Sequence, residues 1–283
     1  GVTFTLTDCE PNSTKGNITH AKDSNNVTLR GSGVDVKENA VFNMYGGNIT
    51  NNATPSSGVG KGGGVSNSGT FTMTGGAISG NKGGMNNGGG GGGVGNYGTF
   101  TMSGTAVIGG TTAEDANTGY SGGGVYNNSG STFNFNGGTI IGNKANAKGG
   151  GVYNGFNATF TMTAGTIAEN KVVAANSSSG DGGGGVYNFG TFTMENTASI
   201  SGNKVTNPDC CGGGVYNCRN FTMTGGTIGG SAKDDANTAG FGGGLYHGSG
   251  EAQLKGGTIQ GNDATISGGG VFYNTNITLN GVT

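Results

Sequence analysis

The sequence lacks several residue types that ordinary globular domains use freely. It has no Trp and only 3 Pro, and charged residues make up 10% of its 283 positions, against about 25% in a typical soluble domain. A formal net charge of −2 without any basic cluster argues against nucleic acid as a partner. No apolar run approaches the ~18 residues of a transmembrane helix, so no membrane span is predicted.

Glycine is what the sequence has in excess. There are 68 Gly, without the three-residue period and the abundant proline of collagen. A Gly-Gly-Gly triplet followed by Val or Leu recurs along the chain, after a degenerate first copy at 31–34. The apolar residues of these copies are Val34, Val65, Val94, Val125, Val152, Val186, Val215, Leu245 and Val271. Their mean spacing is near 30 residues, which indicates stacked repeats that share one core.

Each copy also contains Thr-Phe-Thr-Met-Thr or a variant of it. This alternation predicts a strand with Phe and Met inward and Thr outward. Shorter Val and Ile segments bounded by Gly predict two further strands per copy. We therefore expect an all-β chain: a parallel β-helix (solenoid) of about nine coils of roughly 30 residues, with three short strands per coil. It forms a single domain over 1–283, with an irregular N-terminal segment at 1–30 and repeat coils at 31–283.

Asparagine recurs at two positions of the repeat. Amides repeated at strand spacing can satisfy one another, so each column predicts a hydrogen-bonded ladder at a corner of the coil. One column contains Asn67, Asn96, Asn127, Asn154, Asn188, Asn217 and Asn274. The other contains Asn81, Asn143, Asn170, Asn203 and Asn262.

The repeat is similar to that of a known group of proteins. Gly-Gly-Gly-Val-Tyr followed by Ile-Ser-Gly-Asn, as at Ile78 to Asn81 and Ile200 to Asn203, resembles the repeats of polymorphic outer-membrane proteins and of autotransporter-like bacterial surface adhesins. The resemblance covers about 31–281, with a third Gly where that group has Ala. It implies a right-handed parallel β-helix, export to the cell surface, and a structural or adhesive role.

The sequence offers little for catalysis. Carbohydrate-cleaving β-helices need clustered carboxylates, and the regular strand positions here contain almost no acidic residues. Arg30 and Arg219 are the only arginines, and neither His20 nor His247 has a Ser or Cys partner visible in the sequence. We therefore expect no enzymatic activity, and a polysaccharide lyase or hydrolase is the lowest-ranked alternative.

Two similar loops lie 120 residues apart and suggest a four-coil super-repeat. Their oxygen-rich side chains could hold Ca²⁺, although a solvated turn whose Asp and Asn bond their own backbone is favoured. No other cofactor is predicted. The candidate ligands are Glu114, Asp115, Asn117, Asp234, Asp235 and Asn237.

Two columns of side chains are expected on the outer surface. A threonine face comprises Thr72, Thr101, Thr161, Thr193, Thr222 and Thr278. Such a grid is similar to the surface of ice-binding proteins, although Thr is also simply a good strand former. A tyrosine column comprises Tyr126, Tyr153, Tyr187, Tyr216, Tyr246 and Phe272. It follows the inward Val by one residue, so it is expected to form an exposed stripe that binds glycans or a neighbouring rod, or else a purely structural ladder.

The remaining candidate residues concern modification. Cys218 is expected to form a local disulfide with Cys210 or Cys211, since Cys9 lies about seven coils away. Ten Asn-x-Ser/Thr triplets permit N-glycosylation in a eukaryotic host. They begin at Asn12, Asn17, Asn26, Asn48, Asn52, Asn127, Asn157, Asn176, Asn220 and Asn276.

Strand-like segments occur at both ends of the sequence, at 3–7 and 276–283, without a visible cap. Open strand edges are templates for pairing, so we expect rods to associate head to tail into a filament, or the chain to be one segment of a longer rod. The expected function is that of an extracellular structural or adhesive rod at the cell surface. Its expected partners are other copies of itself and glycans or a host surface. A monomeric glycan-binding rod and an ice-binding protein are the alternatives.

Overall fold

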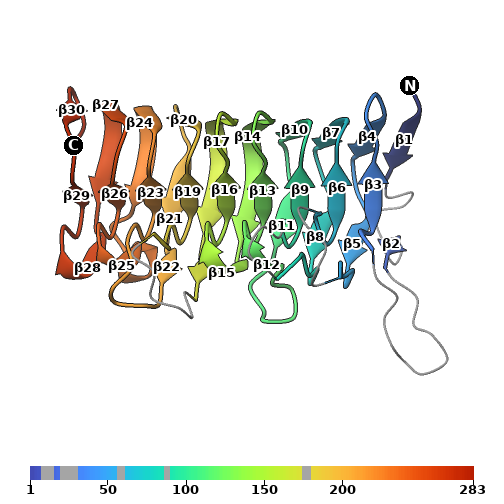
Figure 1. The fold of residues 1–283 in the computed structure, drawn as a ribbon, viewed down its shortest axis with the longest axis horizontal. Helices are drawn as coiled ribbons and strands as arrows, with labels where there is room; N and C mark the ends of the chain where they lie inside the picture. The colour runs from blue at the N-terminus through green and yellow to red at the C-terminus, as the bar shows by residue number, and fades with distance from the viewer. Residues whose placement is uncertain (8–15, 20–30, 56–60, 86–89, 174–179) are drawn as a thin grey trace.

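The chain folds as an all-β parallel β-solenoid, described by a computed structural model over residues 1–7, 16–19, 31–55, 61–85, 90–173 and 180–283. Three parallel sheets run along the stacked coils, as Figure 1 shows. Strands from successive coils pair in parallel throughout, because each coil presents the same pattern of apolar residues to its neighbour.

The first sheet has fifteen strands. Its continuous path consists of β1 (Thr3–Leu6), β4 (Val41–Met44), β7 (Thr70–Met73), β10 (Thr99–Met102), β14 (Thr132–Ile141), β17 (Thr159–Ala168), β20 (Thr191–Met194), β24 (Asn220–Gly229), β27 (Glu251–Gln260) and β30 (Ile277–Leu279). Its shorter strands are β2 (Asn17–Ile18), β5 (Asn48–Thr50), β8 (Ala77–Ser79), β11 (Val107–Gly109) and β21 (Ser199–Ser201). In four coils one long strand takes the place of the two separate strands that the other coils contribute to this sheet; these are β14, β17, β24 and β27.

The other two sheets complete each coil. The second sheet has nine strands: β3 (Val34–Val36), β6 (Val65–Asn67), β9 (Val94–Asn96), β13 (Val125–Asn127), β16 (Val152–Asn154), β19 (Val186–Asn188), β23 (Val215–Asn217), β26 (Leu245–His247) and β29 (Val271–Tyr273). The third sheet has six strands: β12 (Thr118–Ser121), β15 (Lys144–Lys148), β18 (Lys171–Val172), β22 (Lys204–Val205), β25 (Thr238–Phe241) and β28 (Asp263–Ser267). The single helical element of the described residues is the 3₁₀ turn η1 (Lys233–Asp235).

The predicted architecture is confirmed. The nine strands of the second sheet bound about eight turns of roughly 29 residues, with three strands per turn. The expectation of an irregular segment over 1–30 is only partly right. Thr3–Leu6 pairs with β4 and Asn17–Ile18 pairs with β5, so both belong to the solenoid, whereas 8–15 and 20–30 lie outside the described residues.

The interior is filled by aligned apolar columns. The Phe rings stack in register from Phe42 to Phe221, with neighbouring centroids 4.6 to 5.0 Å apart. Met44, Met73 and the residues in register with them form a second column. Each such side chain is essentially fully buried, and each contributes about 1.5–3 kcal/mol relative to exposure.

Two asparagine ladders line the interior corners. Both are confirmed, with corrections to their membership. The first runs from Asn67 to Asn217, but its next member is His247, since Asn274 is exposed and bonds the Tyr246 hydroxyl instead. The second ladder comprises Asn52, Asn81, Asn117, Asn143, Asn170, Asn203, Asn237 and Asn262. Three of these amides, at 52, 117 and 237, were not expected there.

The Gly-Gly-Gly triplet is required by close approach between coils. A Cβ on Gly151 would lie 2.8 Å from the Gly185 carbonyl oxygen and 2.9 Å from Ile167 Cγ2. A Cβ on Gly150 would lie 2.4 Å from the Gly184 carbonyl oxygen. Because backbone atoms cannot move away as a flexible side chain can, no larger residue fits at these positions.

Candidate functional site

A column of lysines follows the second asparagine ladder along the outside of the rod. In the coils that read Asn-Lys, the Asn is buried in the corner and the following Lys is exposed. Lys144, Lys171 and Lys204 each begin a strand of the third sheet, and Lys82 forms an isolated parallel bridge in line with them. The column comprises Lys82, Thr118, Lys144, Lys171, Lys204 and Thr238, paired in that order from coil to coil. We call this set the lysine column. All four lysines are exposed.

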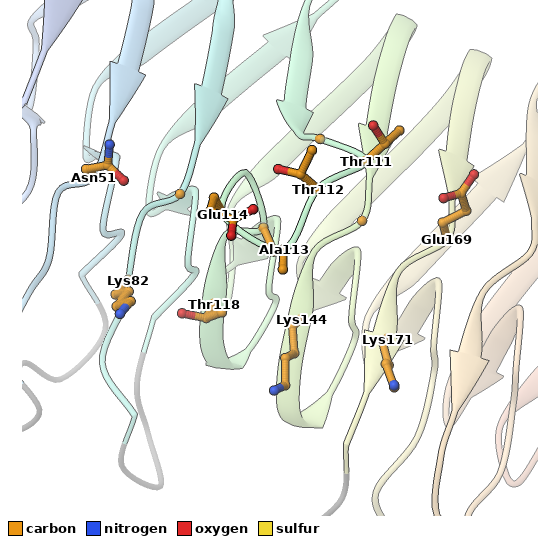
Figure 2. Close-up of a pocket in the computed structure, with 14 residues that line it drawn as sticks. Asn51, Lys82, Thr111, Thr112, Ala113, Glu114, Thr118, Lys144, Glu169 and Lys171 are labelled. Carbon is orange, nitrogen blue, oxygen red and sulfur yellow. The ribbon is translucent and has the colours of Figure 1, made fainter.

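A groove of about 640 Å³ lies beside the lysine column. Lys82, Lys144 and Lys171 line one bank, and the loop from Thr111 to Glu114 rises beside them (Figure 2). Asn51 lies at one end of the groove and Glu169 at the other. The groove therefore presents cationic heads on one bank and hydroxyl, amide and carboxylate groups around them.

The two loops predicted to be related are indeed equivalent in structure. In residues 110–117 the Asp115 carbonyl accepts a bond from Gly80 N at 2.9 Å, and in residues 230–237 the Asp235 carbonyl accepts one from Gly202 N at 2.8 Å. Each loop leads to the coil in which Thr replaces Lys in the lysine column. We call these two segments the acidic loops, because their side chains include Glu114, Asp115, Asp234 and Asp235.

Two of the six candidate calcium ligands are not available to a cation in the acidic loops. Asn117 and Asn237 are fully buried in the second ladder, where each side-chain oxygen accepts bonds from the amide of the preceding coil. They cannot also face a cation in the loop. The Asp115 carboxylate is engaged by Thr112 Oγ1 at 2.7 Å, as expected for a turn that bonds within itself. Among the described residues, no group of three or more His, Cys, Asp or Glu side chains is placed to hold a metal ion.

The lysines of the column have no carboxylate partner within the described part of the chain. The one ion pair there joins Lys37 and Asp35, on another part of the rod. Lys144, Lys171 and Lys204 follow one another on adjacent strands, about 4.8 Å apart by the spacing of paired strands. Like charges placed opposite one another on neighbouring strands are destabilising, so the three ammonium groups repel one another without a direct ion pair to offset the repulsion.

Glu169 occupies an unusual backbone position at the groove. It has φ of 56°, whereas the equivalent residues of the neighbouring coils are Gly142 and Gly202. The other non-Gly residues with positive φ in the described chain are all Asn, which tolerates this conformation better than Glu does. The coil thus keeps a strained carboxylate where Gly would suffice, and such strain often marks a functional position.

The tyrosine column is not the exposed stripe that was expected. Its rings stack in register, and Tyr187 and Tyr216 are buried beside Cys211 and Cys218. Tyr126, Tyr153, Tyr246 and Phe272 are half-buried. Side chains at the end of the third sheet close over the column, because Cys211 and Phe241 pack against it and the Lys148 ammonium lies over the Tyr187 ring. Burial raises the pKa of Tyr153 to about 12. The column is mainly a structural ladder.

The threonine face is in register. Thr72 pairs with Thr101, and Thr161, Thr193 and Thr222 follow one another on successive strands. Asn134 separates the first pair from this run, and Gln253 separates the run from Thr278. The first five threonines are half-buried between their neighbours, and Thr278 is exposed. Each of the first five threonines lies between two fully buried residues of its strand, so its side chain is on the outer side of the first sheet.

The cysteines lie in two different clusters. Cys210 packs with Ala145, Val172, Val205 and Ala239, whereas Cys211 and Cys218 border the tyrosine column. Cys211 and Cys218 are free thiols, and Cys218 Sγ donates to the Tyr187 hydroxyl at 3.4 Å. The predicted local disulfide is therefore not formed in the structure. Burial raises the pKa of Cys211 to about 11, which disfavours its thiolate. Cys9 lies outside the described residues.

Burial separates the possible glycosylation sites. Asn52 and Asn127 are fully buried members of the ladders, so the folded chain cannot present them to a transferase. Asn12, Asn26 and Asn176 lie outside the described residues. The acceptors that are exposed or half-exposed are Asn17, Asn48, Asn157, Asn220 and Asn276.

The lysine column was missed by the sequence reasoning, although a signal for it is present. Asn81-Lys82, Asn143-Lys144, Asn170-Lys171 and Asn203-Lys204 repeat the same dipeptide at coil spacing. In the part of the chain that the structure describes, no helix is long and apolar enough to cross a bilayer.

No known protein family, curated protein or solved structure matches this chain. The fold and its surface chemistry are therefore the basis for any assignment of function.

Proposed function

We propose that this chain is a non-enzymatic extracellular rod with a structural or adhesive role, and that it binds its partner along the lysine-lined groove. The observation that carries the proposal is that the inward side chains serve packing, whereas the outward side chains are left for binding. The inward columns of Phe, Met, Ile and Asn are committed to packing and ladders along the described coils. Binding chemistry is left to the outer surface, where the groove combines a cavity with unpaired charge.

A stacked solenoid suits a mechanical role. About eight turns at the ~4.8 Å strand spacing give a rod of roughly 40 Å. Successive turns are joined by backbone bonds in the first and second sheets, and from β12 onward in the third sheet as well. Side-chain bonds in the two ladders add to these contacts through the middle of the rod. Location at the cell surface is supported by the resemblance of the repeat to those of bacterial surface adhesins.

Self-association is proposed through the ends and not through the tyrosine column. Lateral packing by that column loses support, because two of its rings are buried and four are half-buried. Head-to-tail stacking would pair β30 of one rod with β1 of the next in the first sheet, and β29 with β3 in the second sheet. Sedimentation velocity tests this: oligomers that grow with concentration support it, and a monomer at high concentration contradicts it.

Ice binding is the second candidate, carried by the threonine face. Its side chains lie outward and in register on a parallel sheet. Measurable thermal hysteresis, lost when Thr161 and Thr193 are both replaced by Lys, would support it. Absence of both thermal hysteresis and recrystallisation inhibition would eliminate it.

Binding without cleavage tests the leading proposal. The purified chain is immobilised and presented with a panel of neutral and acidic polysaccharides, and the length of each polysaccharide is measured afterwards by size-exclusion chromatography. The proposal predicts retention of at least one class at unchanged length. Shortening with new reducing or unsaturated ends would show an enzyme instead, and retention of no polysaccharide would remove the glycan-adhesive role.

A further inference from the structure

The fold does not need lysine at the repeat position that is occupied by Lys144, Lys171 and Lys204. The same slot holds Thr118 in the coil before this run and Thr238 in the coil after it, with the parallel pairing unbroken. Thr also forms strands more readily than Lys does. Three adjacent lysines repel one another, and none of them forms an ion pair with a described carboxylate. The fold alone gives no reason for this arrangement.

The acidic loops bound this run on both sides. Residues 110–117 lead into Thr118, immediately before Lys144, and residues 230–237 lead into Thr238, immediately after Lys204. Both loops are held to the preceding coil by the same carbonyl bond. The outer surface therefore has a cationic segment three coils long, with an acidic projection at each end. The loop at the first end also forms one wall of the groove.

We propose that this segment, together with Lys82, binds a linear acidic polysaccharide whose carboxylate or sulfate groups lie along the rod axis. The proposal rests on the proposed adhesive function and names its ligand class. Adjacent lysines are about one strand spacing apart, comparable to the rise of one sugar residue in an extended chain. A regular polyanion could place a charge near each lysine and relieve their mutual repulsion. Thr111, Thr112 and Asn51 line the same groove and offer bonds to sugar hydroxyls.

Nucleic acid fits this surface less well. The groove is lined by no aromatic side chain on which bases could stack and by no arginine that could fork onto phosphates. The whole chain has a net charge of −2, so attraction to any polyanion has to come from the lysine column itself and not from a long-range field. Glu114 and Glu169 add repulsion close to the lysines. A narrow polymer on the lysine bank can avoid these two carboxylates, whereas a broad anionic surface would meet them.

The test uses the full chain and polygalacturonate, with dextran of similar length as the neutral control and single-stranded oligothymidylate as the nucleic-acid control. Affinities are measured by biolayer interferometry at several salt concentrations. In the triple variant Lys144→Thr, Lys171→Thr, Lys204→Thr, each slot takes the residue that neighbouring coils already use. Lys255→Thr is the matched control, since Lys255 is exposed on a different sheet. Circular dichroism verifies that every variant is folded.

We expect wild type and Lys255→Thr to bind polygalacturonate equally, and the triple variant to bind about tenfold or more weakly. The slope of log affinity against log salt should fall by about one for each lysine removed, because each contact releases a counterion. Glu169→Gln should tighten binding by removing a repulsive charge.

Three results would overturn the inference. Equal affinity of the folded triple variant would place the binding elsewhere on the rod and leave the adhesive function intact. Binding of dextran as strong as that of polygalacturonate would remove the role of charge. Tighter binding of oligothymidylate would favour nucleic acid. Retention of no polysaccharide of any class would instead remove the adhesive function on which the inference rests.

Discussion

His247 should make the stability of this solenoid depend on pH. It takes the place of Asn at one end of the first ladder and is fully buried. Each ladder amide donates to the side-chain oxygen of the next coil, so Asn217 Oδ1 accepts from Asn188 and Asn217 Nδ2 must donate onward. Nδ1 of His247, 3.0 Å away, is therefore an unprotonated acceptor. The ring proton lies on Nε2, which donates to Thr275 Oγ1 at 2.9 Å.

A second ring proton would oppose this arrangement. Desolvation by burial lowers the pKa of His247, and protonated Nδ1 would face the Asn217 donor. Since the folded pKa lies below the unfolded value near 6.5, the unfolded chain takes up the proton first as pH falls. The contribution of this residue to the free energy of unfolding is fully present above pH ~6.5 and declines as the pH falls below that value. Its total loss in acid is about 1.4 kcal/mol for each unit by which the native pKa lies below the unfolded one.

Two variants distinguish the effect of protonating the His247 ring from the effect of losing its hydrogen bond in the ladder. His247→Asn supplies the side-chain oxygen used in the other coils and should remove the pH dependence arising from this residue. His247→Ala leaves one of the two Nδ2 protons of Asn217 without an acceptor, while the other still donates to the Arg219 carbonyl. This variant should therefore be less stable than His247→Asn by about 1–3 kcal/mol at pH 8. Urea unfolding monitored by circular dichroism between pH 4.5 and 8 measures both effects. If the stability of His247→Asn declines with acid as steeply as that of wild type, the reasoning about the ring is refuted.

Four further predictions follow from the packing. Asn170→Ala should lower the free energy of unfolding by about 2–4 kcal/mol, because it removes bonds to Ile140, Asn143 and Asn203, whereas exposed Asn274→Ala should change it by under ~1 kcal/mol; equal urea midpoints would contradict the ladder. Gly151→Ala should cost about 1–3 kcal/mol through overpacking against the next coil, whereas Gly180→Ala, with nothing near its Cβ, should be tolerated; thermal melts distinguish the two. The pair Tyr153→Ser with Tyr187→Ser should destabilise the fold by about 3 kcal/mol or more, since both rings belong to a stacked column; an unchanged melting temperature would restore the exposed-stripe interpretation. Expression in a eukaryotic host should glycosylate exposed Asn157 and leave buried Asn127 unmodified, as peptide mass spectrometry would show.

The regular part of the fold could be predicted from the sequence because its chemistry repeats at fixed positions. Alternating Thr and Phe fixes the orientation of each strand in the first sheet, and the triplet of Gly marks where neighbouring coils come closest. The register of the threonine face follows directly from that periodicity. The same reasoning found both asparagine ladders, although not all their members.

The irregular part could not be predicted in the same way. The acidic loops lengthen the spacing before Asn117 and Asn237, so both were assigned to the loops when they are ladder residues. The tyrosine column was expected to be exposed because alternation within its own strands says nothing of Cys211 and Phe241, which cover it from the end of the neighbouring third sheet. The groove depends on a loop rising beside a strand of another coil, which no local pattern encodes.

Lysine footprinting tests the central claim most directly. The chain is acetylated briefly with and without polygalacturonate, and the modification of each lysine is measured by peptide mass spectrometry. Protection of Lys144, Lys171 and Lys204, with Lys255 modified equally in both samples, is the predicted result. Uniform modification of all lysines despite bound polygalacturonate, or protection centred on Lys255, would contradict the account.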